Sequence, residues 1–217
     1  MTLQEVRQLV RKKLDDLEYD GDNIDQAINS FIAEVLNNNR IAFMETTAAI
    51  PFSAGAVDIP LPEDHQVSLN AVVRIPGSQS YSIWNDRLEY AVFSETFPDP
   101  TNSSPQRVCE WCYYGNKIRL SAPAAEAGTL VLDYVRRPAP ATIDNPVLAI
   151  PDNYKQMVVN GATVQIMKMN EDYQEAAQEA DDNDALITTF VRNESRAMQH
   201  VGPIRMKSNR RGGAGWR

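Results

Sequence analysis

The stretch from Ile150 to Met198 decides the fold, and it reads IPDNYKQMVVNGATVQIMKMNEDYQEAAQEADDNDALITTFVRNESRAM. Its face-forming residues recur at spacings of three and four, which is the period of one side of an α-helix. Pro151 suits the first turn of a helix, where an N–H group would lack a partner anyway. We therefore expect two long helices, joined near Asn170 into an antiparallel hairpin. The face positions are Tyr154, Met157, Val158, Gly161, Ala162, Gln165 and Met169 in the first helix, and Tyr173, Ala176, Ala177, Ala180, Ile187, Phe190, Val191 and Met198 in the second.

Two further helices are predicted at the start of the chain. Thr2 and Glu5 have the spacing of a capping box, in which side chains satisfy open backbone N–H groups. The first helix is expected to stop at Gly21, and Asp22 or Asn23 is expected to cap the second, which ends at the run NNNR. Each helix is apolar on one face only, so both need a packing partner, and the C-terminal hairpin is the natural one. The apolar stripes are Leu3, Val6, Val10, Leu14 and Leu17 in the first helix, and Ile24, Ala27, Ile28, Phe31, Ile32 and Val35 in the second.

Between these helices the sequence changes to short alternating runs separated by proline and glycine. Gly115-Asn116 is a two-residue hairpin signal between two of the runs. Many short strands with turn signals predict a small antiparallel sandwich or barrel. The proline-rich loop 97–106 is expected to be exposed. The predicted strands cover residues 41–50, 57–62, 67–75, 80–84, 88–94, 107–114, 117–121 and 129–137.

Together these patterns predict an α+β fold. Its antiparallel α-helical bundle is formed by the N- and C-terminal helix pairs, residues 1–40 and 150–200. An antiparallel β-sandwich or barrel module, residues 41–149, is inserted between them. Residues 201–217 form a basic, extended C-terminal arm.

Composition and charge limit the function classes. With 43% hydrophobic and 23% charged residues, the chain resembles an ordinary soluble globular protein. It has no run long enough to span a bilayer and no signal-peptide pattern, so we expect a cytosolic, membrane-free protein. The net charge is −8; residues 192–217 carry +6, so residues 1–191 carry −14. This asymmetry predicts that the tail meets an acidic partner and that the body repels nucleic acid.

No constellation of catalytic, cofactor-binding or metal-binding residues is found in the sequence, so we expect a protein that is not an enzyme. Phosphate-binding glycine loops and zinc-protease or hydrolase motifs do not occur. Cys109 and Cys112 lie in a predicted strand, where positions three apart point to opposite faces. They are therefore interpreted as structural thiols. The acidic cluster 179–184 is interpreted as a solvated helix face, or as an acidic surface in an assembly, because it lacks the glycine of a calcium loop.

The tail that follows Gly202-Pro203 allows two interpretations. Its composition cannot bury enough apolar surface to fold alone, so it is either a solvated end or an arm that becomes ordered on a partner. Its tryptophan and arginines favour the arm, since these residues often anchor interfaces. The candidate arm residues are Ile204, Arg205, Met206, Lys207, Arg210, Arg211, Trp216 and Arg217.

The order of these elements resembles the head-to-tail adaptor, or connector, proteins of tailed bacteriophages. A helix reading IDQAINSFIAEVLNNNRIAFMET is followed by a strand-rich insertion and then by LAIPDNYKQMVVNGATVQIMKM. The matching features are the I-N-x-x-[IF] helix that leads into N-N-N-R, the I-P-[DE]-x-Y helix start, and Gly161-Ala162. The similarity in element order covers the whole chain.

The resemblance implies a structural role in the virion at the head–tail interface, with assembly in the host cytoplasm. Such adaptors form a ring, usually dodecameric, beneath the portal protein, and genomic DNA passes through its channel without sequence-specific binding. Their C-terminal arm docks in the portal, and their distal surface receives tail or nozzle proteins. On this sequence the arm would be residues 205–217, with Trp216 as its anchor.

Two alternatives are open at this point. A neck or tail-completion protein would contact the tail rather than the portal. A carbohydrate- or cell-surface-binding module would use the predicted strands and the aromatic run Trp111, Tyr113 and Tyr114, although aromatic residues are also common in sheet packing.

Overall fold

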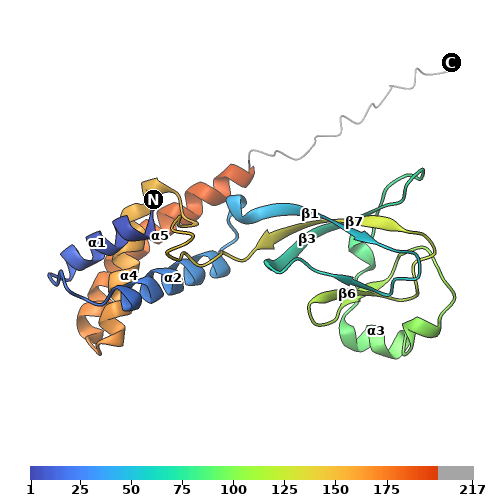
Figure 1. The fold of residues 1–217 in the computed structure, drawn as a ribbon, viewed down its shortest axis with the longest axis horizontal. Coiled ribbons are helices and arrows are strands. Elements are labelled where there is room, and N and C mark those ends of the chain that lie inside the picture. The colour runs from blue at the N-terminus through green and yellow to red at the C-terminus, as the bar shows by residue number, and fades with distance from the viewer. Residues whose placement is uncertain (200–217) are drawn as a thin grey trace, which may run out of the picture.

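Helices α1, α2, α4 and α5 gather at one end of an elongated molecule, and the strands and helix α3 gather at the other (Figure 1). The computed structural model describes residues 1–199. They form a mixed α+β fold with antiparallel sheets, which confirms that part of the prediction. The helices are α1 (Leu3–Lys13), α2 (Gly21–Asn38), α3 (Tyr90–Thr96), α4 (Lys155–Met169) and α5 (Tyr173–Gln199). The strands are β1 (Glu45–Phe52), β2 (Asp58–Pro60), β3 (His65–Arg74), β4 (Tyr81–Ser82), β5 (Trp111–Tyr113), β6 (Lys117–Leu120) and β7 (Gly128–Arg136).

Helix α4 is the central element of the helical end. It contacts α1, α2 and α5, and nine of its fifteen residues are buried. The prediction of a single apolar face is therefore wrong for this helix, because three helices surround it. Its buried residues are Met157, Val158, Val159, Asn160, Gly161, Ala162, Thr163, Val164 and Ile166. The turn near Asn170 is found as expected, with Asn170 as the C-cap of α4 and Glu171 in the left-handed region at φ 66°.

Helix α5 packs through one side only. Ala176 and Phe190 are fully buried, in agreement with their predicted face. Tyr173 and Ala177 were expected on the same face, but both are exposed. Pro151 also differs from the prediction: it precedes a 3₁₀ turn, Asp152–Tyr154, and α4 begins only after that turn.

The N-terminal helices agree with the prediction at the start of α1 and differ from it in the turn between α1 and α2. The Thr2–Glu5 capping box is present. Helix α1 ends at Lys13 rather than near Gly21, because Asp15 adopts a positive φ of 53° and turns the chain. Leu17, which was expected on the apolar stripe, is 74% exposed. Asp20 caps α2 by accepting from the backbone N–H of Asp22, so the cap lies two or three residues earlier than the expected Asp22 or Asn23.

Seven strands form two antiparallel sheets, with the orders β1-β7-β3-β4 and β2-β6-β5. Strand β1 pairs along its whole length with β7, from Glu45 opposite Val135 to Phe52 opposite Gly128. A hydrophobic core joins residues of both sheets, including Trp111, Ile118 and Leu132. The sheets do not close into a barrel, so the barrel alternative is wrong. Among the described strands, β1 and β4 are free edges of the larger sheet.

Residues 88–94 were predicted as a strand but lie largely in helix α3. The run LEYAVFS is too short for its hydrophobic period to distinguish a helix from a strand. Phe93 is buried and lies 5.2 Å, centroid to centroid, from Phe97 one turn later. This pairing of residues four apart is a helical contact. Residues 42–44, expected as strand, form a 3₁₀ turn before β1.

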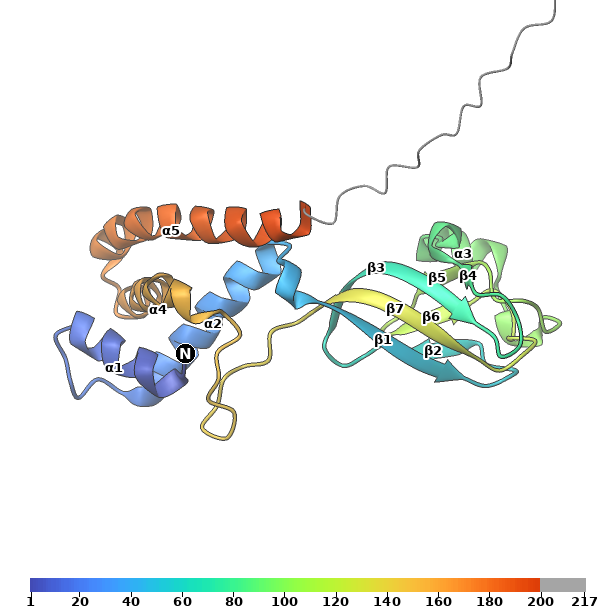
Figure 2. The same cartoon turned by 90° about the horizontal axis from the view of Figure 1, so that it is seen from above.

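Residues 137–149 lead from β7 back to the helices, and we call them the connecting segment. The N-terminus pairs with its end: Leu3 N–H donates to Pro146 O at 2.7 Å and Leu148 N–H donates to Met1 O at 3.2 Å. The two ends of the helical sequence are thereby held together with the strand-bearing residues between them (Figure 2).

Candidate functional site

The candidate arm lies outside the residues that the structure describes. The structure therefore gives no geometry for Ile204, Arg205, Met206, Lys207, Arg210, Arg211, Trp216 or Arg217. It does describe α5, which precedes them in the chain. The surfaces below are the remaining candidates for contact with other molecules.

The outer face of α5 is acidic and lined with small residues. Asp181, Asp182 and Asp184 are exposed, and none of them forms an ion pair with a side chain in the described part of the molecule. Glu179 differs, since it faces inward and pairs with Lys13 of α1. This agrees with the interpretation of cluster 179–184 as a solvated face, except at Glu179 and at Asn183, which is buried and donates to Met157 O at 3.2 Å.

The connecting segment carries two highly exposed aliphatic side chains. Ile143 is 83% exposed and Val147 is 63% exposed. A groove of about 700 Å³, lined in part by Val147, lies between the connecting segment and the loop before β3. Its charged lining residues are Glu63, Asp64, Arg136 and Arg137. Sequence reasoning missed this surface, because the segment carries proline and polar residues that are typical of an ordinary loop.

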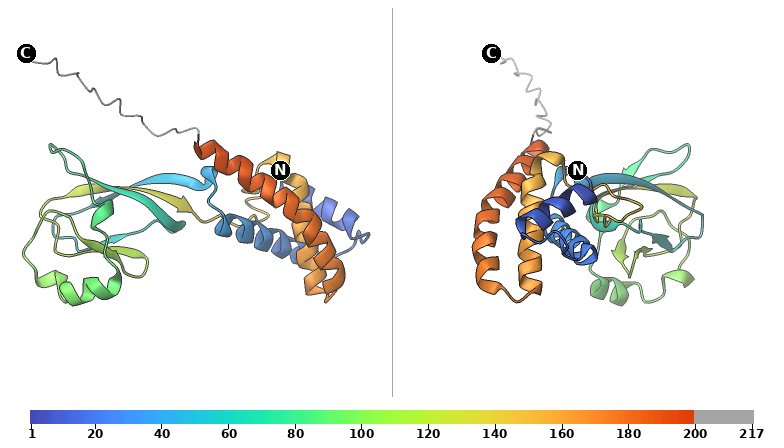
Figure 3. Two further views of the ribbon diagram at one scale, coloured as in Figure 1. Left: turned by 180° about the vertical axis from the view of Figure 1, so that it is seen from behind. Right: turned by 60° about the vertical axis from the view of Figure 1, so that its left-hand side comes forward.

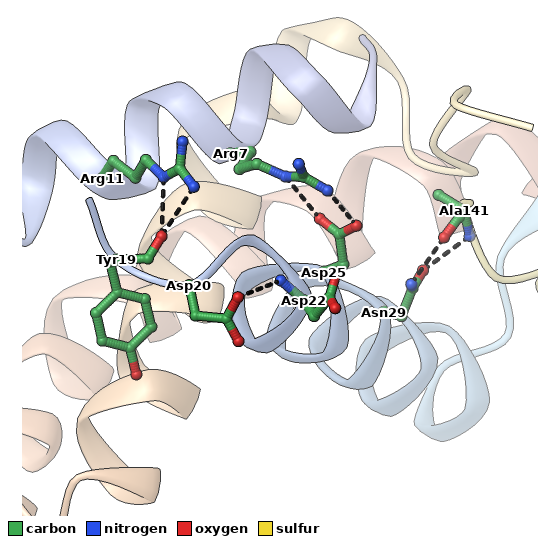
Figure 4. A network of polar contacts seen from close by, with 8 residues as sticks. All are labelled: Arg7, Arg11, Tyr19, Asp20, Asp22, Asp25, Asn29 and Ala141. Carbon is green, nitrogen blue, oxygen red and sulfur yellow. Dashed lines mark hydrogen bonds and ion pairs between the residues drawn. The ribbon is translucent and has the colours of Figure 1, made fainter. Parts of the chain in front are cut away.

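A polar network fixes the connecting segment and α1 on α2 (Figure 4). Asn29 of α2 accepts from Ala141 N–H at 2.8 Å and donates to Ala141 O at 2.9 Å. Arg7 donates to both carboxylate oxygens of Asp25, a bidentate pair. Arg11 donates twice to Tyr19 O, at 3.0 and 2.8 Å. The exposed side chains of the connecting segment are thus presented by a backbone that is anchored at both ends.

The far end of the strand region carries exposed aromatic residues. Tyr90 of α3 stacks on Tyr114 at a centroid distance of 5.3 Å, and the Arg119 guanidinium lies 3.8 Å from the Tyr114 ring centre. Arg119 also donates to Asp58, which lowers the pKa of that carboxyl group. Trp111 and Tyr113 of the same aromatic run lie in β5 instead, where Trp111 is buried and donates to Ile83 O at 2.7 Å. They are packing residues rather than part of an aromatic platform.

Cys109 and Cys112 are free thiols. Cys112 is buried in β5, and Cys109 lies just before this strand; burial raises the pKa of both thiols. Within residues 1–199 no group of three or more His, Cys, Asp or Glu side chains is arranged to hold a metal ion. No helix in this part of the chain is long and apolar enough to cross a membrane.

Comparison with known protein families identifies the class of protein to which these surfaces belong. The sequence profile of the SU10 adaptor protein family matches residues 1–207. The chain belongs to this family. The SU10 adaptor family consists of phage structural adaptors and is not a family of enzymes. The expected resemblance to phage head-to-tail adaptors is thereby confirmed at the level of the family.

As a SU10 adaptor, the chain is a virion component that interacts with other head or tail proteins of a phage. A search of curated proteins finds no match to it. The exposed faces of α5, the connecting segment and α3 are accordingly candidate protein–protein surfaces of the adaptor.

Proposed function

We propose that this adaptor forms a ring beneath the portal, docks there through its C-terminal arm, and offers the tail a platform. The family match over residues 1–207 carries this proposal. In this proposal, residues 1–40 and 150–200 act as the helical ring module, residues 41–149 as the module that faces the tail, and residues 201–217 as the arm.

The charge layout supports a channel through which DNA passes. Residues 1–191 carry −14, and residues 192–217 carry +6. A ring built from the acidic body repels the phosphate backbone, so DNA slides through without being held. The basic arm, in contrast, is suited to an acidic surface of the portal.

Portal binding by a truncated chain tests the arm. Portal protein is mixed with the full chain or with a chain that ends at Gly202, and the bound mass is measured by analytical ultracentrifugation. We expect the full chain to bind and the truncated chain to lose binding by at least about tenfold. Undiminished binding by the truncated chain would overturn the arm assignment. Binding to purified tail but not to portal would instead identify a tail-completion protein.

A further inference from the structure

A cleft of about 540 Å³ opens in the strand region, and we call it the strand-end cleft. It lies between the loop that joins β3 to β4 and two further segments, residues 106–108 and 125–126. Figure 1 and the left-hand view of Figure 3 show this teal loop at the end of the molecule that lies away from the helical end. The cleft is therefore separate from the surfaces of α5 and the connecting segment.

Backbone hydrogen bonds hold the walls of the strand-end cleft in place. Gln106 N–H donates to Pro123 O, and Ala125 N–H donates to Gln106 O, both at 2.8 Å. These bonds pair the two wall segments with each other. Ser78 N–H donates to Ile75 O at 3.0 Å and closes the turn of the loop. A ligand thus meets a site that is largely formed before binding, which lowers the entropic cost of binding.

The lining of the strand-end cleft combines apolar and neutral polar side chains. Val108 is buried, and Ile75 and Tyr81 are partly buried against the core of the strand region. Ser78 and Gln106 are exposed and supply hydroxyl and amide groups. An apolar cleft with a few convergent polar groups is the usual composition of a ligand-binding site.

Arg107 is the cation among the lining residues. Its guanidinium carbon lies 3.7 Å from the centre of the Tyr81 ring. This stacking restricts the guanidinium group and leaves its in-plane N–H donors available, and such a planar fork matches a carboxylate. No carboxylate within residues 1–199 lies at ion-pair distance from Arg107. The nearest acidic residues in the sequence, Asp99 and Glu110, instead accept hydrogen bonds from neighbouring hydroxyl groups.

Glu126 is the other charged lining residue, and it narrows the choice of ligand. It is exposed and forms no ion pair with Arg107. Its carboxylate repels a free dianion such as phosphate, because like charges in one cleft disfavour each other. A peptide segment suits both groups, since an acidic side chain can pair with Arg107 while a backbone N–H donates to Glu126.

We propose that the strand-end cleft binds a peptide segment of a tail protein in which an acidic residue stands beside an apolar one. The carboxylate of the segment pairs with Arg107, and its apolar side chain contacts Ile75 and Val108. A backbone N–H of the segment donates to Glu126. This inference rests on the proposed function, which assigns the strand end to the tail, and it names the chemistry by which the tail is recognised.

Titration with a small probe tests the cleft in the full-length chain without any partner protein. The probe is acetyl-Leu-Glu-amide, the control is acetyl-Leu-Gln-amide, and binding is followed by NMR at the amides of residues 78–81 and 106–108. We expect the acidic peptide to bind at least about tenfold more tightly than the neutral one, because a hydrogen-bonded charge pair forms only with the acid.

A matched pair of arginine substitutions shows whether Arg107 carries this preference. Arg107→Lys keeps the charge and loses the planar fork, so it should weaken binding of the acidic peptide by at least about fivefold. Arg87→Lys is the control, because Arg87 lies over Tyr113 outside the cleft, and it should bind like the wild-type chain. Absence of binding, equal binding of the two peptides, phosphate binding as tight as that of the acidic peptide, or equal effects of the two substitutions would overturn the site.

Purified tail protein tests the source of the segment. In sedimentation velocity, Arg107→Lys should bind tail protein at least about fivefold more weakly than the wild-type chain, and Arg87→Lys should bind it equally well. Tail binding that Arg107→Lys leaves unchanged would overturn the tail segment as the ligand.

The cleft and portal docking can fail separately. A chain that binds the acidic probe but not portal supports the cleft and overturns portal docking. A chain that binds portal but not the probe overturns the cleft and leaves portal docking in place.

Discussion

At the scale of single residues, Gly161 sets how closely α4 and α2 approach. A Cβ atom at this position would lie 2.2 to 2.4 Å from three ring atoms of Phe31, far inside van der Waals contact. We expect Gly161→Ala to destabilise the fold by about 1–3 kcal/mol through overpacking, although alanine favours a helix by about 1 kcal/mol over glycine. Urea unfolding measures the change. The exposed control Gln178→Ala should alter stability little; equal stability of both variants with the wild-type chain would contradict the close contact.

The hydroxyl group of Tyr134 should make stability depend on pH in the alkaline range. Burial and the hydrogen bond to Asp64 raise the pKa of Tyr134 to about 12. An unfolded chain, with a tyrosine pKa near 10, loses this proton at lower pH than the folded protein does. The stabilising contribution is therefore fully present below about pH 10 and is lost as the pH rises towards about 12.

The variant Tyr134→Phe isolates this effect. Between about pH 9 and 11 the unfolding free energy of the wild-type chain should fall more steeply with pH than that of the variant. The two chains should show parallel pH dependence at lower pH, where the tyrosine is protonated in both states. Parallel curves across the alkaline range would show that the Tyr134 pKa is not raised.

At the scale of elements, Asn29 holds the connecting segment on α2. It satisfies both backbone groups of Ala141, which is buried. Asn29→Ala leaves these groups without partners, at an expected cost of about 1–3 kcal/mol, and the Ala141 amide should exchange its proton faster. Hydrogen exchange and urea unfolding measure both effects. Ser30→Ala, at the exposed position beside it, should change neither; unchanged exchange at Ala141 in Asn29→Ala would argue against the anchor.

Phe190 anchors α5 by packing against the rest of the helical end. It is fully buried, and its ring packs edge-on against Tyr154 at 4.7 Å and lies 6.3 Å from Phe43, centroid to centroid. Phe190→Ala should cost about 3–5 kcal/mol, as large-to-small core substitutions do, and should loosen the C-terminal half of α5 in hydrogen exchange. Thr188→Ala on the exposed side of α5 is the control. A cost below about 1 kcal/mol would mean that this aromatic cluster does not secure the helix.

Local sequence patterns predicted the elements whose structure is determined by residues close together in the sequence. The capping box at Thr2, the turn at Asn170 and the alternating strands were predictable, because each rests on residues a few positions apart. The helix at residues 88–94 was not predictable, since a run of seven residues fits the period of a helix and of a strand. The burial of Phe93 in the folded protein favours the helix. The end of α1 also depends on a backbone feature, the positive φ of Asp15, that the apolar stripe does not reveal.

The candidate surfaces were only partly predictable. The acidic face of α5 is visible in the sequence as the run from Glu179 to Asp184. The connecting segment is not, because its position depends on the pairing of Leu3 with Pro146 and of Asn29 with Ala141. Contacts between residues so distant in sequence leave no periodic signal. The arm residues that the sequence singled out stay a prediction.

At the scale of the whole molecule, the chain places a helical end and a strand end along one axis (Figure 1). In the proposed function, the helical end builds the ring. In the same proposal, the strand end carries the exposed Tyr90 and Tyr114 as a surface for a tail protein. The proposal thereby gives self-association and tail binding to opposite ends of one subunit.

The mass of the complex that the full-length chain forms with purified portal tests this account most directly. Native mass spectrometry should show portal carrying a fixed number of additional subunits of 24.3 kDa each, with the fully occupied ring favoured over partly filled ones. Portal that gains no mass, or that gains single subunits without preference for a closed set, would contradict a ring-forming adaptor.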